Sequence, residues 1–196
     1  PISPIMSIVQ KSVSRIVGSN AHLMICDIQE RFRPLIHQMD PVINKAILLN
    51  KACNTLEIPT LITEQYPKVF GNTVPEISVY PGTQVFAKKQ FSMISPEIST
   101  ILKNSGRTQV IVCGIEAHVC VLQSVLDLVE GGFEVHLVAD AVSSQRSYDR
   151  KMALRRLEST PNVTFTTTES LLFELVRTAE HPHFRTISGL LKEHNH

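Results

Sequence analysis

The sequence predicts a three-layer α/β domain built on a parallel sheet, and three observations support this fold class. Short apolar or β-branched runs recur along the chain, helical patterns separate them, and polar residues follow the runs where strands would end. Strands that alternate with helices favour βαβ units, in which helices cover both faces of one sheet. Such strands should be short and almost wholly apolar, because both of their faces are buried.

Six runs have the composition of buried strands, and five helical patterns lie between or after them. The predicted strands are Ala21–Cys26, Pro59–Thr63, Gln84–Ala87, Gln109–Cys113, Glu134–Ala139 and Asn162–Thr166. The predicted helices are Pro41–Leu56, Pro96–Lys103, Ala117–Glu130, Ser147–Leu157 and Ser170–Thr178, with a last amphipathic stretch after Pro182. No linker, repeat or low-complexity tract interrupts the alternation, so we expect a single domain over residues 1–196.

Composition and charge exclude several classes of protein. The chain has 19 basic and 18 acidic residues and no basic block, so we expect no nucleic-acid partner. No apolar stretch approaches the roughly 18 residues of a membrane-spanning helix, so no membrane partner is expected either. The four Cys form no CxxC pair, which favours a reduced, intracellular compartment. The cytoplasm is the first choice.

The first twenty residues allow a second interpretation of the localisation. They lack Asp and Glu but contain Lys11, Arg15 and several Ser. This composition has a weak similarity to an organelle transit peptide, which would place the protein in mitochondria. An ordinary polar leader or a peripheral N-terminal segment fits residues 1–20 at least as well.

Cys120 lies where a predicted strand meets a predicted helix. The run Gln109–Cys113 ends at Gly114, and the helical pattern Ala117–Glu130 begins just before the thiol. A helix N-terminus favours thiolate over thiol, and the turn between strand and helix is where an open α/β sheet forms its ligand crevice. The alternative is a buried Cys packed under a helix, which is the commoner situation for an arbitrary Cys. A catalytic thiol also needs acid–base partners at the same edge.

Two other predicted strands end in charged residues. Asp27 closes an apolar run, where an unpaired carboxylate would be costly, and Lys88 and Lys89 follow the third run. The alternatives are a turn or N-cap role for Asp27 and a solvated surface position for the lysines. Composition alone does not choose between the two lysines. With Cys120, an acid and a Lys support attack on a carbonyl carbon, with the carboxylate as proton acceptor and the ammonium near the thiolate.

Neighbours of these groups are candidate pocket residues. An apolar wall would come from Phe32 and Phe91, and polar contacts from residues close to the strand ends: Gln29, Glu64, Gln65 and Tyr66. Gln29 would also orient Asp27 by hydrogen bonding. Core packing or loop shaping is the alternative for each of these residues. His118 precedes Cys120 by two positions, so we expect it to point away from the thiol.

Five motifs follow one another in order along the chain. They are Cys26–Phe32, Thr63–Pro67 with Thr73–Glu76, Lys88–Met93, Gly114–Val121 and Asp140–Ser144. Together they make the chain resemble the isochorismatase-like cysteine hydrolase superfamily, in its isochorismatase domain-containing branch, over about residues 23–192. The resemblance implies a six-stranded parallel, Rossmann-like sheet. Right-handed crossovers give the strand order 3-2-1-4-5-6.

The same resemblance implies the parts of an active site. Matched by motif, the catalytic residues are Asp27, Lys88 and Cys120, and Lys88 is preferred because the superfamily's Lys precedes the Phe-Ser pair by three positions. We expect Asp27 and Lys88 within about 3–4 Å of the Cys120 sulfur. The resemblance also implies a non-proline cis peptide at Ile115–Glu116, which would aim an oxyanion-hole N–H, and a homo-oligomer, a dimer or higher.

Branches of this superfamily differ in chemistry, and the sequence separates some of them. Nicotinamidases add a metal site of one Asp and two His, but here no His lies between His37 and His118 and no Asp between Asp40 and Asp127. We therefore expect no metal and no cofactor. Members that cleave isochorismate replace the Cys with Gly. A metal-independent hydrolase of a small amide-like or ester-like substrate, acting through a thioester, remains. The alternative is a non-catalytic ligand-binding or interaction module, a pseudoenzyme or thiol sensor.

Overall fold

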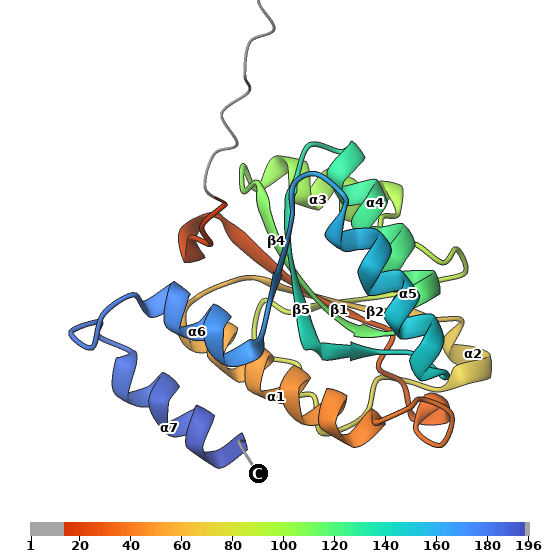
Figure 1. Ribbon diagram of the computed structural model, residues 1–196, viewed down its shortest axis with the longest axis horizontal. Coiled ribbons are helices and arrows are strands. Elements are labelled where there is room, and N and C mark those ends of the chain that lie inside the picture. Colours follow the sequence, from red (N-terminus) through yellow and green to blue (C-terminus); the bar gives the residue numbers. More distant parts are fainter. Residues whose placement is uncertain (1–13, 195–196) are drawn as a thin grey trace, which may run out of the picture.

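The computed structural model describes residues 14–194, in which strands and helices alternate (Figure 1). The strands are β1 (Ala21–Cys26), β2 (Thr60–Gln65), β3 (Gln84–Lys88), β4 (Gln109–Ile115), β5 (Glu134–Ser143) and β6 (Val163–Thr166). The helices are α1 (Met39–Thr55), α2 (Pro67–Phe70), α3 (Pro96–Asn104), α4 (Leu122–Glu130), α5 (Ser147–Glu158), α6 (Thr168–Val176) and α7 (Phe184–His194). Three short helical turns are η1 (Gly18–Asn20), η2 (Glu30–Phe32) and η3 (Ala117–Val121).

The six strands form one parallel sheet in the order β3-β2-β1-β4-β5-β6. The predicted fold class and strand order are both confirmed. The chain builds the sheet outward from β1 to β3 on one side, and then returns to pair β4 with the other edge of β1. In an open α/β sheet this change of direction leaves a crevice at the carboxyl ends of the strands, where ligands bind.

The core lies on both faces of the sheet, because side chains of a strand point alternately to the two faces. In β1, Leu23 and Ile25 belong to the apolar cluster that also contains residues of α1, α6 and α7. Met24 and Cys26 belong to the opposite cluster, with residues of α3, α4 and α5. Figure 1 shows these two sets of helices on opposite sides of the sheet.

Two elements differ from their predicted form. The helical pattern expected over Ala117–Glu130 begins as the π-helical turn η3 and becomes α-helical only at Leu122. Strand β5 continues past the predicted end at Ala139 as far as Ser143, after a register shift relative to β4. Arg150 of α5 stabilises this irregular segment by donating hydrogen bonds to the carbonyl oxygens of Val142, at 2.7 Å, and of Ala139.

The segment before β1 is part of the folded domain from residue 14 onward. Ile16 is fully buried, and its backbone N–H donates to the Glu174 carboxylate at 3.1 Å. The backbone N–H of Val17 donates to the Gln109 side chain at 2.9 Å. The part of the expected leader that includes Lys11 lies outside the described residues. Over residues 14–194, no helix has both the length and the apolar character required to cross a bilayer.

Candidate active site

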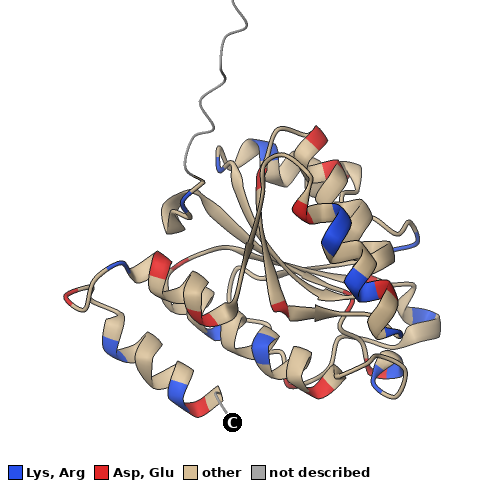
Figure 2. Cartoon of the chain, in the orientation of Figure 1, with Lys and Arg blue, Asp and Glu red and all other residues tan. Residues whose placement is uncertain are grey.

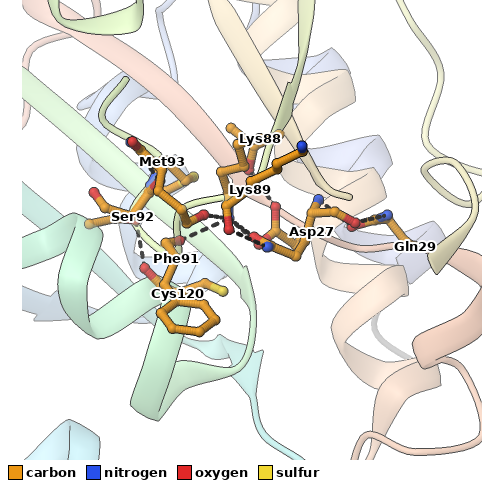
Figure 3. Close-up of polar contacts among 12 residues, drawn as sticks. Asp27, Gln29, Lys88, Lys89, Phe91, Ser92, Met93 and Cys120 are labelled. Carbon is orange, nitrogen blue, oxygen red and sulfur yellow. Dashed lines mark hydrogen bonds and ion pairs between the residues drawn. The ribbon is translucent and has the colours of Figure 1, made fainter. Parts of the chain in front are cut away.

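Asp27 and Lys88 form a buried ion pair at the carboxyl edge of the sheet (Figure 3). Asp27 directly follows β1 and Lys88 is the last residue of β3. Lys88 Nζ lies 2.7 Å from Asp27 Oδ2, and the side chains are only 3% and 2% exposed, respectively. A buried charge without a partner costs several kcal/mol, so each of these groups requires the other.

The second carboxylate oxygen of Asp27 is bound by β2. Thr63 Oγ1 donates a hydrogen bond of 2.8 Å to Asp27 Oδ1, and the Asp27 backbone N–H donates to the Thr63 carbonyl at 3.1 Å. Thr63 was not among the residues predicted for the site. Its position near the end of a predicted strand could have indicated this role. Thr63 and Gln65 lie on the same face of β2, because residues two apart in a strand share a face.

Lys88 is surrounded by oxygen atoms. Besides Asp27, Nζ donates to Gln65 Oε1 at 2.7 Å, to the Phe91 carbonyl at 2.8 Å and to the Gln90 carbonyl at 3.2 Å. Burial by itself would lower the pKa of Lys88. The negative charges that Cys26, Asp27 and Cys120 can carry, together with the hydrogen bond to Asp27, outweigh burial and raise this pKa above its ordinary value. Lys88 is therefore a cation at neutral pH.

The two adjacent lysines point in different directions. Lys88 is buried in the site, whereas Lys89 is exposed and its Nζ lies 5.6 Å from the centre of the Tyr66 ring. Successive residues at the end of a strand point to opposite sides, which explains the difference. The ammonium at the sheet edge belongs to Lys88.

Cys120 is held in the π-helical turn η3, which follows β4. The turn starts at Glu116, whose φ of 56° lies in the left-handed region, and the Val121 N–H donates to the Glu116 carbonyl at 3.3 Å. Ser124 Oγ donates to the Cys120 carbonyl at 2.6 Å and accepts from the Met93 N–H at 2.7 Å. Ser124 thus ties the cysteine turn to the loop that follows Lys88.

The Cys120 thiol is coupled to the ion pair by charge and not by a direct hydrogen bond. A negative charge on Cys120 acts on Lys88. Among residues 14–194, however, no hydrogen bond joins the Cys120 sulfur to Asp27 or Lys88, whose own bonds go to other oxygen atoms. The separation of about 3–4 Å from the sulfur stays a prediction. Cys26 is a buried neighbour of Cys120 in the same apolar cluster.

The other three thiols are unsuited to nucleophilic chemistry. Burial, the neighbouring Cys120 side chain and the charge of Asp27 raise the pKa of Cys26 well above its ordinary value. Burial raises the pKa of Cys53 to about 12 and also raises that of Cys113. These thiols stay protonated at neutral pH.

Cys120 opens onto a cavity of about 270 Å³ with mostly apolar walls. Its lining residues are Phe32, Gln65, Phe70, Phe91, Glu116, His118, Val119, Cys120, Gln145 and Arg146. The rings of Phe32 and Phe70 stack with their centres 4.7 Å apart. A cavity with apolar walls and few polar groups suits the recognition of a small organic molecule.

Three predicted pocket residues are not among those that line this cavity. Gln29 is fully buried and its amide bonds to the backbones of Gln65 and Gly71 instead of to Asp27. Glu64 accepts two hydrogen bonds from Thr73, at 2.7 and 2.9 Å, and so holds the loop after α2. Tyr66 is 41% exposed and borders a separate depression beside Lys89.

The predicted cis peptide at Ile115–Glu116 is wrong, because the described residues contain no cis peptide bond. The chain turns here through two left-handed residues instead. Gly114 has a φ of 133° and Glu116 a φ of 56°. A Cβ at Gly114 would lie 2.2 Å from the Cys26 carbonyl oxygen, so only glycine allows β4 to approach β1 this closely.

His118 lines the cavity but does not contact the thiol. Its Nδ1 lies 3.1 Å from Ser144 Oγ and 3.2 Å from Glu116 Oε2, and its Nε2 lies 3.9 Å from Asp149 Oδ2. These contacts connect the ring to Asp149 of α5 and to Ser144, which directly follows β5. Within residues 14–194, no three His, Cys, Asp or Glu side chains are placed to hold a metal ion.

Comparisons with known proteins show the family and the fold of this chain. Residues 21–170 match the isochorismatase domain family. An isochorismatase domain-containing protein 2 from Danio rerio is 45% identical over 91% of this chain and 90% of its own length. A structure described as a MAR1 ribonuclease from Caenorhabditis elegans is 40% identical and superposes with a TM-score of 0.88, covering 91% of this chain and 93% of that one. The fold is also shared by the YcaC gene product of Escherichia coli, described as an octameric hydrolase of unknown specificity, at 23% identity and a TM-score of 0.85 over 92% of this chain and 91% of that one. The chain therefore belongs to the isochorismatase-like hydrolase family.

Proposed function

We propose that this protein is a metal-independent cysteine hydrolase that cleaves a small amide or ester through a thioester on Cys120. The observation that carries the proposal is the buried Asp27–Lys88 ion pair at the sheet edge where Cys120 opens onto a cavity. A buried pair of this kind, next to a cavity-lining thiol, provides both a proton acceptor and a fixed positive charge.

The reaction needs two half-reactions. In the first, the Cys120 sulfur attacks the carbonyl carbon, Asp27 takes the thiol proton, and the same proton passes to the departing amine or alcohol. In the second, water attacks the thioester, Asp27 takes a proton from the water, and the proton returns to the sulfur as the carboxylic acid leaves. No metal or cofactor enters either step. Lys88 stabilises the thiolate by its charge and keeps Asp27 in place.

The oxyanion of each tetrahedral intermediate needs hydrogen-bond donors. We assign this role to backbone N–H groups of the turn around Ile115 and Glu116, which immediately precedes η3. Preorganised N–H groups of this kind typically contribute about 2.7–4 kcal/mol to the stability of the transition state. The walls of the substrate pocket would come from Phe32 and Phe91.

The test is a panel of small amides and esters assayed with the wild type and with Cys120→Ala. Hydrolysis of at least one class by the wild type, lost in the variant and unaffected by a chelator, supports the proposal. A wild type that binds compounds of the panel in the cavity but turns none of them over supports the non-catalytic module instead. Activity that a chelator removes and Zn²⁺ or Mn²⁺ restores contradicts the metal-independent mechanism.

The substrate is proposed to be a small molecule and not a nucleic acid. The Caenorhabditis elegans relative is described as a ribonuclease, but the 19 basic and 18 acidic residues of this chain nearly cancel. Figure 2 shows both basic and acidic residues on the visible helices. A formal net charge of +1 gives little overall attraction to a phosphate backbone. Failure to bind or cleave RNA at low salt is the expected result, and RNA cleavage lost in Cys120→Ala would redirect the assignment.

A further inference from the structure

Gln65 connects the buried ion pair to the cavity. Its side chain lines the cavity together with Cys120, and its Oε1 accepts a hydrogen bond of 2.7 Å from Lys88 Nζ. Its Nε2 donates to the Lys89 carbonyl at 2.8 Å. Because the amide nitrogen is engaged by a carbonyl, the amide oxygen must face the ammonium.

Gln29 fixes Gln65 from the opposite side. Gln29 Oε1 accepts from the Gln65 N–H at 2.7 Å, and Gln29 Nε2 donates to the Gln65 carbonyl at 3.0 Å and to the Gly71 carbonyl at 2.6 Å. Gln29 is fully buried and follows Asp27 by two residues. The ends of β1, β2 and β3 are thus joined by a chain of hydrogen bonds that runs from Gln29 through Gln65 and Lys88 to Asp27.

The oxygen acceptors around Lys88 differ in charge, and this difference affects the Cys120 thiolate. An ammonium has three N–H donors, which match the three shortest contacts of Lys88 Nζ: to Asp27 and Gln65 at 2.7 Å and to the Phe91 carbonyl at 2.8 Å. The Gln90 carbonyl, at 3.2 Å, is a longer and weaker fourth contact that does not replace Gln65. Only Asp27 carries a charge, whereas Gln65 and the two backbone carbonyls are neutral acceptors. The N–H groups are therefore saturated without adding negative charge, and no N–H is left for the Cys120 sulfur. A second carboxylate here would make the pair net negative and oppose a thiolate nearby.

We propose, building on the proposed function, that Gln65 is a positioning residue. It is a neutral acceptor that keeps Lys88 a fully coordinated cation, so that Lys88 acts on Cys120 through its charge and not through a hydrogen bond. The position requires an acceptor that brings no charge. Gln65 supplies it at the end of β2, where Gln29 prevents it from moving.

The first test is the rate at which iodoacetamide alkylates Cys120 at pH 7. Gln65→Glu should slow alkylation about tenfold. A second negative charge beside Lys88 disfavours the thiolate, and the alkylation rate falls in proportion to the fraction of Cys120 present as thiolate. The matched control is Gln123→Glu, which adds the same charge three residues after Cys120 but at an exposed position of α4. The control should stay within about twofold of the wild type, because exposed charges are screened by water and salt. Equal rates in the two variants would overturn the proposal.

A second test does not depend on the thiol. In ¹⁵N NMR spectra of the lysine side chains, the Lys88 ammonium should exchange slowly with water in the wild type, with its signal assigned by its loss in Lys88→Met. Gln65→Met keeps the size of the side chain and removes the acceptor, so exchange should accelerate at least about fivefold. Unchanged exchange contradicts the role of Gln65 even if Gln65→Glu does not fold. An unreactive Cys120 in the wild type would count against the proposed function alone.

Discussion

At the scale of single residues, the most important property of the site is the burial of Asp27 and Lys88, whose side chains have almost no contact with water. Asp27 receives one donor on each oxygen, from Thr63 and from Lys88. With both oxygens engaged, the carboxylate has a single orientation, and its remaining lone pairs are available to a proton from Cys120. The residues of the pair therefore act as a unit rather than as independent contributors.

The first prediction concerns this unit. Asp27→Asn and Lys88→Met should each reduce turnover by a factor of at least about 100, and the double variant should be scarcely worse than either single one, because residues that act together are not additive. The measurement is kcat on the best substrate of the panel. Lys89→Ala, which removes the exposed neighbour, serves as the control and should stay within about threefold of the wild type. Additive losses in the double variant would show that the two groups work separately.

The second prediction concerns His22, a buried residue of β1 whose Nε2 lies 2.9 Å from Ser105 Oγ. Burial and the charge of Arg107 lower its pKa from 6.5 to about 4. The unfolded chain then binds more protons between these two values, so stability is full above pH 6.5 and falls as the pH decreases toward 4. The loss attributable to His22 should reach about 3 kcal/mol.

Urea unfolding at several pH values measures this loss. His22→Asn keeps a polar group at the position and removes the titration, so the difference between the pH profiles of the two proteins isolates His22 from other groups. His136, whose pKa is also lowered by burial, contributes equally to both profiles. Parallel profiles for wild type and variant would contradict the assignment.

At the scale of secondary-structure elements, the close approach of β1 and β4 determines where the cysteine turn begins. Cys26 and Gly114 are register partners, and a Cβ on Gly114 would meet Cys26 within 2.2–2.6 Å. The same residue has a φ of 133°. Glycine is required here both by the space and by the backbone conformation, and the turn that carries Cys120 starts immediately afterwards.

The third prediction follows from this contact. Gly114→Ala should lower the free energy of unfolding by about 3 kcal/mol or more, because it combines overpacking with an unfavourable φ. Gly132→Ala is the matched control, since its φ is 86° but nothing lies within 4 Å of the added Cβ. The control should lose only about 1 kcal/mol. Similar losses in denaturant unfolding of the two variants would mean that the strand contact is not tight.

Much of the fold could be predicted from the sequence because its signals are local. The apolar strands, the helices between them and the charged residues at strand ends are all patterns of neighbouring residues. The choice of Lys88 over Lys89 came from motif spacing, and its position at the end of β3 agrees with that choice. The π-helical form of η3 was not predictable, because apolar spacing does not distinguish it from the start of an α-helix.

The errors in the site arose from contacts that span elements. Gln29 was expected to bond to Asp27, but it bonds to Gln65 of β2. The two glutamines are far apart in the sequence, so no local pattern indicates this contact. Glu64 was expected to line the pocket and Thr63 was not considered for the site. Strand alternation places the two side chains on opposite faces, and it is Thr63 that contacts Asp27. The cis peptide was predicted only from the resemblance to the superfamily. In this structure the chain changes direction through Glu116, whose φ lies in the left-handed region.

At the scale of the whole molecule, the edge of the sheet is incompletely covered. β3 is an edge strand, and Val85 within it is 42% exposed. Val79 in the preceding loop is 61% exposed. Natural proteins usually protect an exposed apolar edge with charges, with a covering segment or with a second chain.

The fourth prediction is that the protein is a homo-oligomer, a dimer or higher, and that the β3 edge contributes to the interface. Sedimentation velocity at micromolar concentration should show a species larger than the 21.9 kDa chain. Val85→Lys places a charge on the edge and should shift the population toward monomer, whereas Val69→Lys, which changes an equally exposed Val of α2, should leave it unchanged. A wild type that sediments as a monomer would exclude this assembly.

The central claim is that Cys120 becomes covalently acylated with help from Asp27, and intact-protein mass spectrometry tests it most directly. After brief mixing with p-nitrophenyl acetate, we expect one added acetyl group, located on Cys120 by peptide mapping. The adduct should be absent in Cys120→Ala and should form at least about 100 times more slowly in Asp27→Asn. An adduct on another residue, or acetylation of Cys120 at the same rate without the Asp27 carboxylate, would contradict the account.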